Sequence, residues 1–343
     1  MLKTALISDR RFLNHVAGRR HPERPERAKV MMDMADTLDR SITHLQAPRE
    51  AERDEIALCH EQSYIDTIER TANFEHCDLD PDTHTCAESF KTAVLAAGGA
   101  LTAVEAVADG AAANAFSIVR PPGHHALPER AMGFCFFNNV AIAAAYLVKK
   151  RGLKRVMVID WDLHHGNGTQ EIFYDSPEVL YVSTHQYPFY PGTGAINEMG
   201  TGRGEGYTVN VPLPAGFGDA EFMDIFDEVI LPIGRKYRPE FVLISSGFDG
   251  HYRDPLGELN VTEDGFTAMA RRLKRLAGEC CDGKLVAVLE GGYDLEALAS
   301  SGKAVIQELA RDADEPITRP HTTSQAIPLI ERELRKLSHF WRF

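Results

Sequence analysis

The chain has few of the features that mark disulfide-stabilised, membrane-spanning or disordered proteins. Its six cysteines include no CxxC pair and no regular framework, so we expect free thiols in a reducing compartment. Residues 1–11 carry four charged side chains and contain no apolar run long enough for a signal peptide or a membrane span. We therefore expect a cytoplasmic protein.

Basic residues are also in deficit. The 37 Lys and Arg residues stand against 50 Asp and Glu residues, which gives a formal net charge of -13 and an isoelectric point near 5.5. This balance argues against nucleic acid and against an anionic membrane surface as direct partners. An acidic surface would attract a cationic substrate weakly, and it would equally serve solubility.

The composition is that of an ordinary folded protein, with 44% hydrophobic and 25% charged residues. Enzymes that alternate strands and helices often build one continuous core from a chain of this length, so we expect a single domain over residues 1–343. Its core should span about residues 1–311, followed by a tail at 312–343 with helical character around residues 327–337. The tail ends in His339-Phe-Trp-Arg-Phe343, and it packs either on the domain or on a second copy in a homo-oligomer.

Short apolar runs alternate with helical stretches along the chain. The predicted buried strands are residues 4–7, 115–119, 155–159, 179–183, 207–211, 241–245 and 285–289. The predicted helices are residues 85–109, 138–150, 219–236, 262–278 and 295–310, the third with Asp219 as its N-terminal cap. The alternation predicts a three-layer α/β fold in which helices cover both faces of a central, mostly parallel sheet. Ligands bind at the carboxyl ends of such strands, so polar residues directly after an apolar run are candidates for chemistry.

One apolar run leads straight into Asp160, Asp162 and His164, and another ends shortly before Asp249. Asp162 and His164 are two residues apart, so in extended backbone they project to the same side and can share one ion. With Asp249 they make three ligands and leave one position open, as in a catalytic site that suits zinc, with iron(II) and cobalt(II) as alternatives. Taken singly, the residues are better explained as turn caps and a buried histidine, but their combination with the motifs below favours a metal site.

Two further motifs follow predicted strands. The segment Arg120-Pro-Pro-Gly-His124-His125 is a rigid turn that delivers paired imidazoles, which can act as acid and base near neutral pH. A double histidine alone would equally fit a surface pair or a second metal site. The segment Glu290-Gly-Gly-Tyr293 places a phenol on a glycine loop, where it could donate to a developing oxyanion or pack as an aromatic ring at a helix start.

Taken together and in this order, four motifs resemble the histone deacetylase family, especially its class II branch and its bacterial deacetylase-like relatives. They are HHA at residues 124–126, DWDLHHGNGT at 160–169, SSGFD at 245–249 and EGGYD at 290–294. The resemblance extends over about residues 21–293. Its supporting stretches are residues 21–27, 81–83, 132–139, 190–194 and 254–258.

The resemblance implies that Asp162, His164 and Asp249 bind zinc. The metal and Tyr293 would polarise an acyl carbonyl, and the zinc would acidify the attacking water. Some family members carry His at the position of Tyr293 and hydrolyse acetyl-lysine poorly, so the tyrosine implies a working deacetylase.

The resemblance also implies roles for the two histidines. His125 would be the main general base and then the acid, bonded to Asn167, while His124 would bond Asp160 and tune the site electrostatically. Many family members have Asp at the position of Asn167, whereas the class II branch commonly has Asn. A neutral partner should leave His125 less basic.

Potassium is a further implied cofactor. A structural potassium near the zinc would be held by backbone oxygens of Asp160, Asp162 and His164 together with Ser183 and Thr184. A second would lie near Phe173, Ser176, Val179 and Tyr207.

The implied substrate tunnel is walled by Phe134 and by Tyr190, which replaces the usual Phe, with Gly133 nearby. An apolar lysine stem could slide between these aromatic faces. Leu256 stands where polyamine-preferring relatives carry glutamate, and this neutral rim favours acetyl-lysine. Asp82 lies in a loop where relatives hold the substrate backbone, or it caps the helix that follows.

The predicted function is a zinc-dependent amidohydrolase that deacetylates Nε-acetyl-lysine in proteins or peptides. The first alternative is a deacetylase of acetylpolyamines or of another small acylated amine, which acidic residues at the pocket mouth would favour. A non-catalytic acyl-lysine reader conflicts with the complete set of metal, histidine and tyrosine positions. A manganese ureohydrolase would need further Asp and His ligands for two bridged metals, and the sequence indicates one complete ligand set.

Overall fold

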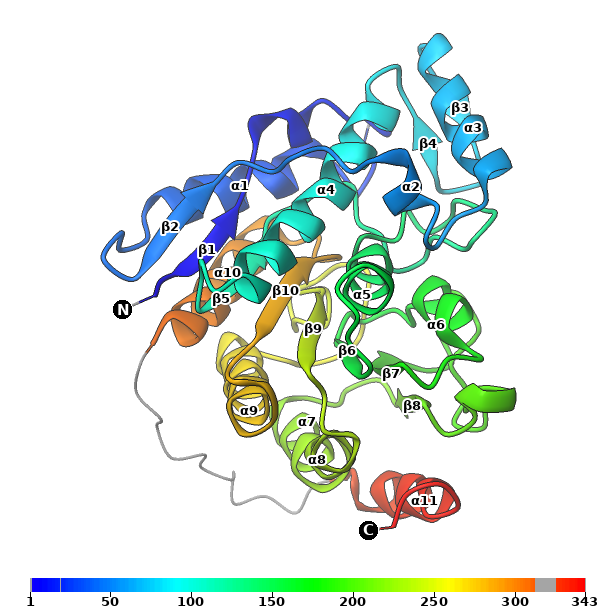
Figure 1. The fold of residues 1–343 in the computed structure, drawn as a ribbon, viewed down its shortest axis with the longest axis vertical. Helices are drawn as coiled ribbons and strands as arrows, with labels where there is room; N and C mark the ends of the chain where they lie inside the picture. Colours follow the sequence, from blue (N-terminus) through cyan, green and yellow to red (C-terminus); the bar gives the residue numbers. More distant parts are fainter. Residues whose placement is uncertain (1, 19, 312–324, 343) are drawn as a thin grey trace.

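The computed structural model describes residues 2–18, 20–311 and 325–342, and its centre is an eight-stranded parallel sheet (Figure 1). The strand order is β2-β1-β5-β10-β9-β6-β7-β8. The strands are β1 (Thr4–Ile7), β2 (Thr43–Gln46), β5 (Asn114–Ser117), β6 (Val156–Asp160), β7 (Val179–Gln186), β8 (Thr208–Leu213), β9 (Phe241–Ser246) and β10 (Leu285–Leu289). A separate antiparallel pair, β3 (Cys77–Asp78) and β4 (His84–Thr85), forms a small hairpin.

Helices cover both faces of the sheet, as the alternation of elements predicts. Most of these strands are buried on both sides, which is why they consist of nearly continuous apolar residues. One hydrophobic cluster lies between the sheet and α4 and α5, and a second lies between the opposite face and α1, α7, α8, α9 and α10. The helices are α1 (Pro25–Asp36), α2 (Arg53–Ile56), α3 (Gln62–Arg70), α4 (Ser89–Ala108), α5 (Asn139–Lys149), α6 (Asn167–Phe173), α7 (Asp219–Ile225), α8 (Leu231–Tyr237), α9 (Glu263–Cys281), α10 (Leu295–Ala310) and α11 (Ile327–Leu337).

Helix α4 is long and apolar enough to cross a membrane by length and composition. In the structure 78% of its apolar stretch is buried, because α4 packs along β1, β5 and β10 and against α5. The core position accounts for its composition.

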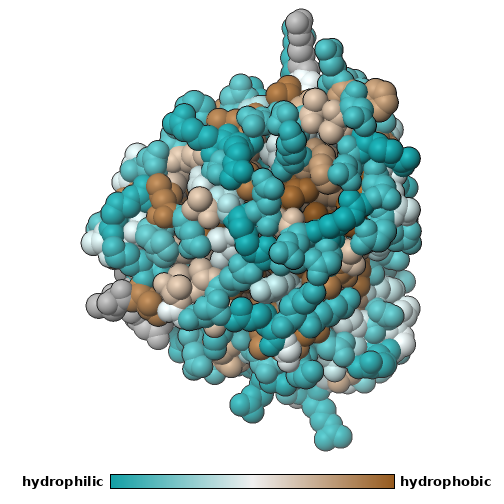
Figure 2. All heavy atoms as spheres, turned by 45° about the horizontal axis from the view of Figure 1, so that its top comes forward, coloured by the Kyte–Doolittle hydropathy of each residue, from teal (hydrophilic) through white to brown (hydrophobic). Residues whose placement is uncertain are grey.

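The face of the molecule seen in Figure 2 is mostly hydrophilic. Figure 2 shows a face on which teal side chains predominate and hydrophobic ones form separate patches. Large hydrophobic side chains that are more than a third exposed are scattered along the described residues: Leu2, Val16, Ile42, Leu45, Phe74, Tyr252, Ile327 and Phe340. Single exposed hydrophobic residues of this kind are normal on folded proteins.

The C-terminal segment packs on its own domain. Helix α11 has the bounds that the sequence predicts, and its buried Leu337 belongs to the same hydrophobic cluster as α7 to α10. The Trp341 indole donates a hydrogen bond of 2.9 Å to the Gly206 carbonyl, and its ring contacts Tyr207 and Tyr237. The other part of the predicted tail, residues 312–324, lies outside the described residues.

The predicted element bounds agree with the structure at β1, β10, α10 and α11 and differ elsewhere. The predicted strand at 115–119 stops at Ser117, and the predicted helix at 85–109 begins at Ser89 because Thr85 belongs to β4. The stretch at 219–236 is helical but contains a π-helical turn, Phe226–Ile230, between α7 and α8.

The prediction that Asp219 caps this helix is wrong. The cap residue is Gly218, and the Asp219 carboxylate instead accepts hydrogen bonds from the backbone N–H and the hydroxyl of Thr262, at 2.8 and 2.6 Å. Asp219 therefore ties the start of α7 to the residue that caps α9.

The four chemical motifs follow four adjacent strands. β5, β10, β9 and β6 are neighbours in the centre of the sheet and run in the same direction. The segments that leave their carboxyl ends therefore meet over the middle of the sheet, which is where ligands bind in open parallel sheets. All six cysteines are free, as expected.

Candidate active site

Asp162, His164 and Asp249 lie together in the interior of the protein. The His164 Nδ1 atom is 3.0 Å from Asp249 Oδ2 and 3.3 Å from Asp162 Oδ1. All three residues are buried, and one ligand atom from each lies within 4.8 Å of the others. A tetrahedral zinc with ligand bonds of about 2.0 Å places ligand atoms about 3.3 Å apart, so the three side chains fit such an ion.

The backbone fixes these side chains by direct hydrogen bonds. Asp162 and His164 lie in a bend after β6, so the expectation of extended backbone is wrong, and they meet because Asp162 Oδ1 accepts from the His164 N–H at 2.9 Å. Asp249 Oδ1 accepts from the Leu163 N–H at 3.0 Å, and Asp162 Oδ2 accepts from the Gly291 N–H at 2.9 Å. A Cβ atom on Gly291 would lie only 2.3 Å from Asp249 Oδ2, so this position requires glycine.

Burial and the charges around this group shift the pKa values of its two carboxylic acids in opposite directions. Burial and the charge of Asp162 raise the pKa of Asp249 to about 7. Burial opposes ionisation of Asp162 too, but His124 and His164 outweigh it and hold the pKa of Asp162 well below its ordinary value. Two carboxylates that repel each other in a buried place favour a cation between them.

The pKa values of the two adjacent histidines are shifted in opposite directions. Burial lowers the pKa of His124, but the charges of Asp162 and Asp160 outweigh it and raise this pKa to about 10. Burial, with the charges of His124 and His164, holds the pKa of His125 well below its ordinary value. Pairs of groups with pKa values pushed apart in this way are suited to acid and base roles.

Both predicted partners of the histidines are in contact with them. The His124 Nδ1 atom lies 3.1 Å from Asp160 Oδ2, which also accepts from the Tyr181 hydroxyl at 3.1 Å. The His125 Nδ1 atom lies 2.8 Å from Asn167 Oδ1. Since this oxygen only accepts, Nδ1 of neutral His125 carries the proton and Nε2 keeps a free lone pair.

Tyr293 faces the same pocket and is positioned by two charged residues. Its backbone N–H donates to Asp254 Oδ2 at 2.6 Å, and the Arg27 guanidinium lies 4.9 Å from the centre of its ring. Arg27 also donates to the Gly292 carbonyl at 2.6 Å. Burial raises the pKa of Tyr293 well above its ordinary value despite Arg27, so the phenol keeps its proton and can donate.

A narrow pocket of about 190 Å³ opens onto these groups. It brings together all five predicted substrate-binding residues with one metal ligand, the candidate base and the tyrosine. The lining residues are Asp82, His125, Gly133, Phe134, His164, Tyr190, Leu256 and Tyr293.

The pocket wall is fixed at Gly133 and Phe134. Both residues have positive φ, at 57° and 70°, and a Cβ atom on Gly133 would lie 2.3 Å from the His125 ring. The Gly133 N–H donates to Asp82 Oδ1 at 3.2 Å, and the Phe134 N–H donates to Thr83 Oγ1 at 3.0 Å. Asp82 thus lies in the turn of the β3–β4 hairpin, seven residues before α4, and the alternative that it caps that helix is wrong.

The residues expected at the first potassium site are also near one another. Asp160 pairs with Ser183 in the register of β6 and β7, and the Thr184 hydroxyl lies 3.5 Å from the Asp160 carbonyl oxygen. Of the residues expected at the second site, Phe173, Ser176 and Val179 line one surface pocket. The fourth, Tyr207, accepts a hydrogen bond at its backbone carbonyl oxygen from the Tyr181 N–H.

Sequence reasoning assigned no role to several residues that hold the site. Arg27 and Asp254 position Tyr293, and the buried Glu290 carboxylate accepts from the backbone N–H groups of Gly123 and His124 at 2.6 and 3.1 Å. The available signal was the position of these charged residues inside the motif stretches 21–27, 254–258 and 290–294.

Comparisons with known proteins match deacetylases over most of the chain. Residues 21–309 match the histone deacetylase domain. The chain is 43% identical over 311 residues to a probable deacetylase of Archaeoglobus fulgidus, covering 90% of this chain and 86% of that protein. It is 41% identical over 299 residues to the chloroplastic histone deacetylase 10 of Oryza sativa subsp. japonica, covering 82% and 68% of the two chains. The crystal structure of the HDA15 HD domain matches with a TM-score of 0.91 at 38% identity, over 99% of this chain and 95% of that one.

Proposed function

The chain belongs to the histone deacetylase family and is a deacetylase hydrolase, and from this premise we propose that it removes the acetyl group from Nε-acetyl-lysine in proteins or peptides with a bound zinc ion. The observation that carries the proposal is one small pocket that is lined both by His125, His164 and Tyr293 and by the aromatic rings of Phe134 and Tyr190. A lysine stem of four methylene groups suits a pocket with aromatic walls.

Asp162, His164 and Asp249 would hold the zinc. When bound there, zinc supplies Lewis acidity that polarises the acyl carbonyl and makes a water acidic enough to attack near neutral pH. The proposal is supported by the burial, the spacing and the mutual repulsion of the carboxylates.

The chain's own groups handle the protons. His125 accepts the proton of the attacking water at Nε2, because its Nδ1 proton is engaged by Asn167. It then delivers this proton to the leaving lysine amine, while His124 stays charged beside Asp160 and stabilises negative charge in the site. The Tyr293 hydroxyl donates to the carbonyl oxygen as it becomes an oxyanion.

The same proposal includes the two structural potassium ions. The fully buried Asp160, Ser183 and Thr184 offer oxygen atoms on adjacent strands β6 and β7, and oxygen donors are what an alkali cation requires. A potassium there would stabilise the bend that carries Asp162 and His164. Thermal unfolding in potassium and in choline buffers of equal ionic strength tests this role, and an identical melting temperature in both would contradict it.

Acetylpolyamines or another small acylated amine are the alternative substrates. Asp80 and Asp82 in the hairpin turn provide negative charge at the pocket mouth, which an internal ammonium would favour. The neutral Leu256 side chain in the pocket lining offers no partner to such a charge, and this is why we favour acetyl-lysine.

A paired assay decides between these substrates. Purified protein of known metal content is compared on acetyl-lysine peptides and on N-acetylated polyamines, with a hydroxamate chelator as control. We expect higher, chelator-sensitive kcat/KM on the peptides, and higher kcat/KM on the polyamines would overturn the assignment. Leu256→Glu should shift preference towards polyamines, whereas Leu256→Gln, which has similar size and no charge, should not.

A further inference from the structure

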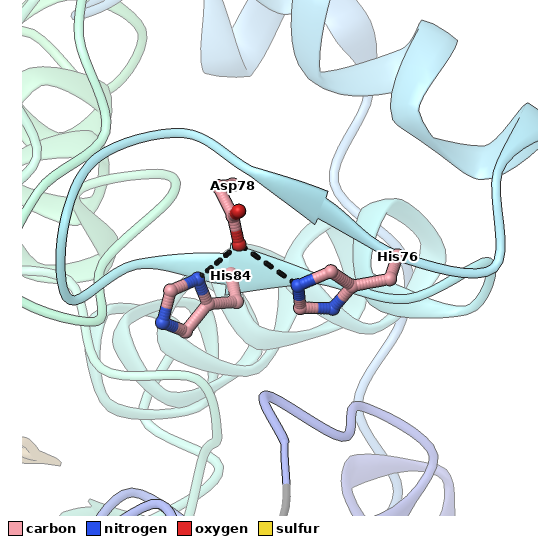
Figure 3. Close-up of side chains that lie close together, drawn as sticks. All are labelled: His76, Asp78 and His84. Carbon is pink, nitrogen blue, oxygen red and sulfur yellow. Dashed lines mark hydrogen bonds and ion pairs between the residues drawn. The ribbon is translucent and has the colours of Figure 1, made fainter.

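A second group of metal-ligating side chains lies on the β3–β4 hairpin, and the candidate active site does not use it. His76 Nε2 is 2.8 Å and His84 Nδ1 is 2.7 Å from the same atom, Asp78 Oδ1 (Figure 3). The centroids of the two imidazole rings are 5.5 Å apart, and the planes of the rings are tilted by 31° to each other. Two nitrogen atoms and one carboxylate oxygen therefore converge on one small region.

The hairpin itself creates this convergence. His76 directly precedes β3 and lies two residues before Asp78, a spacing that places the two side chains on the same side of an extended backbone. Asp78 is paired with His84 across the hairpin. Figure 3 shows both imidazoles directed at the carboxylate. A two-stranded hairpin of this size is marginal alone, so a bond across it would stabilise it.

The donor set is one that borderline divalent metals prefer. Imidazole suits zinc, copper and nickel, and two imidazoles with a carboxylate leave further positions for water. Ligand atoms around a tetrahedral ion are about 3.3 Å apart, so the contacts of 2.7 and 2.8 Å must open by about 0.5 Å to admit one. The side chains of His76 and Asp78 are 54% and 68% exposed and are free of the packing that would prevent this change.

His21 separates this group from the pocket. Its Nδ1 contacts the backbone of Glu23 and its Nε2 lies 3.1 Å from the Asp82 carbonyl, so both ring nitrogens are engaged. The centroid of its ring lies 5.7 Å from that of the His84 ring and 4.7 Å from that of Phe134, which is part of the pocket wall. The hairpin group is thus a neighbour of the pocket rim and lies outside the pocket lining.

We propose that His76, Asp78 and His84 bind a second divalent transition-metal ion, of the zinc or nickel type, which joins the two strands of the hairpin next to its turn. The hairpin turn carries Asp82, whose carboxylate holds the pocket wall at Gly133. A metal beside the turn therefore restrains the segment that shapes the pocket mouth. The binding itself is independent of the chemistry at Asp162, His164 and Asp249.

Metal stoichiometry of the full chain tests the proposal. Equilibrium dialysis against buffered Zn²⁺ should give two ions per wild-type chain and one per His76→Ala/His84→Ala chain. His339→Ala, which removes an exposed histidine outside the hairpin, is the matched control and should keep two. An equal number of ions in the wild type and the double variant would overturn the site, because two imidazole N–H groups that donate to Asp78 give the same contacts without metal.

A second measurement separates this proposal from the proposed function. Asp249→Ala should lose the buried ion and still take up the hairpin ion. Cu²⁺ bound to that variant should show nitrogen couplings from two imidazoles by electron paramagnetic resonance, and from one after the further change His84→Ala. If Asp249→Ala binds no ion, the hairpin site is refuted, whereas an inactive wild type with two ions refutes only the proposed function.

Discussion

The Asp162, His164 and Asp249 group and the His76, Asp78 and His84 group offer the same kinds of ligand atom in very different surroundings. The first is buried over the centre of the sheet, and its carboxylates accept hydrogen bonds from three backbone N–H groups. The second lies on a short hairpin, where Asp78 accepts from the two imidazoles themselves. Surroundings rather than ligand type decide what each group can do.

The buried surroundings have two consequences. Ligands that are already held near the separation that a metal requires lose little freedom on binding, so the buried group should bind more tightly than the exposed one. Burial also shifts the pKa values of neighbouring groups such as His124 and His125 in opposite directions. An exposed group has no comparable field, so it is suited to a structural role.

The largest expected difference between the groups comes from removing one ligand of each. Asp249→Ala should lose its metal and lower kcat/KM by more than about 1,000-fold, because both functions of the ion are lost with it. The chain should still fold, since the change removes a carboxylate that Asp162 repels. Metal content, turnover and thermal unfolding measure the three effects.

Removing one ligand of the hairpin group should have little effect on turnover. His84→Ala should leave kcat within about twofold of the wild type, because His84 lies outside the pocket lining and away from the reacting centre. Comparable losses of turnover in the two variants would remove the distinction between a catalytic and a structural group. Full zinc occupancy in Asp249→Ala would likewise contradict the ligand assignment.

Tyr293→Phe tests whether the buried group works with a specific donor. Loss of one oxyanion donor should lower kcat by about 100-fold to 1,000-fold, and metal content should be unchanged because Tyr293 is not a ligand. Tyr252→Phe removes the hydroxyl of a tyrosine that is 56% exposed, and it serves as the control. Near-normal turnover of Tyr293→Phe would remove its assigned role.

The contrast between the groups also explains what the sequence could predict. The buried group follows long apolar runs, so Asp162, His164 and Asp249 stand out as polar residues at strand ends. The ends of β1 and β10 were predicted to the residue for the same reason, since apolar runs stop sharply there.

Elements without such a run were missed. The edge strand β2 (Thr43–Gln46) has one buried residue of four, and β3 and β4 have two residues each, too few for any periodic pattern. His76 and His84 come together only through the register of that hairpin. The role of Asp219 was mispredicted because its partner Thr262 is distant in the sequence.

The protonation of His125 depends on a neutral neighbour, and Asn167→Asp changes that. A carboxylate at 2.8 Å favours the charged imidazole and should raise the pKa of His125 by about 1 unit or more. Because His125 must be neutral to accept a proton, the acid limb of kcat/KM should move to higher pH by the same amount. The rate on the alkaline side should change little.

Asn167→Ala is the control for this pH profile. It removes the same hydrogen bond without adding charge, so it should reduce turnover and leave the acid limb unmoved or lower. An unchanged acid limb in Asn167→Asp would show that another group, and not His125, controls it.

The smallest expected effect lies between the two groups, at Asp82, which is part of the hairpin turn and also lines the pocket. Asp82→Asn keeps an oxygen for the Gly133 N–H but loses the charge, which should raise KM for peptides about fivefold, since charged hydrogen bonds exceed neutral ones by about 1 kcal/mol. We expect kcat within about twofold and unchanged uptake of the hairpin metal, because Asp82 is not among its ligands. Asp80→Asn removes a nearby charge without touching the wall. If it raises KM equally, rim charge alone draws in the substrate, and if it does not, Asp82 acts through the pocket wall that the hairpin supports.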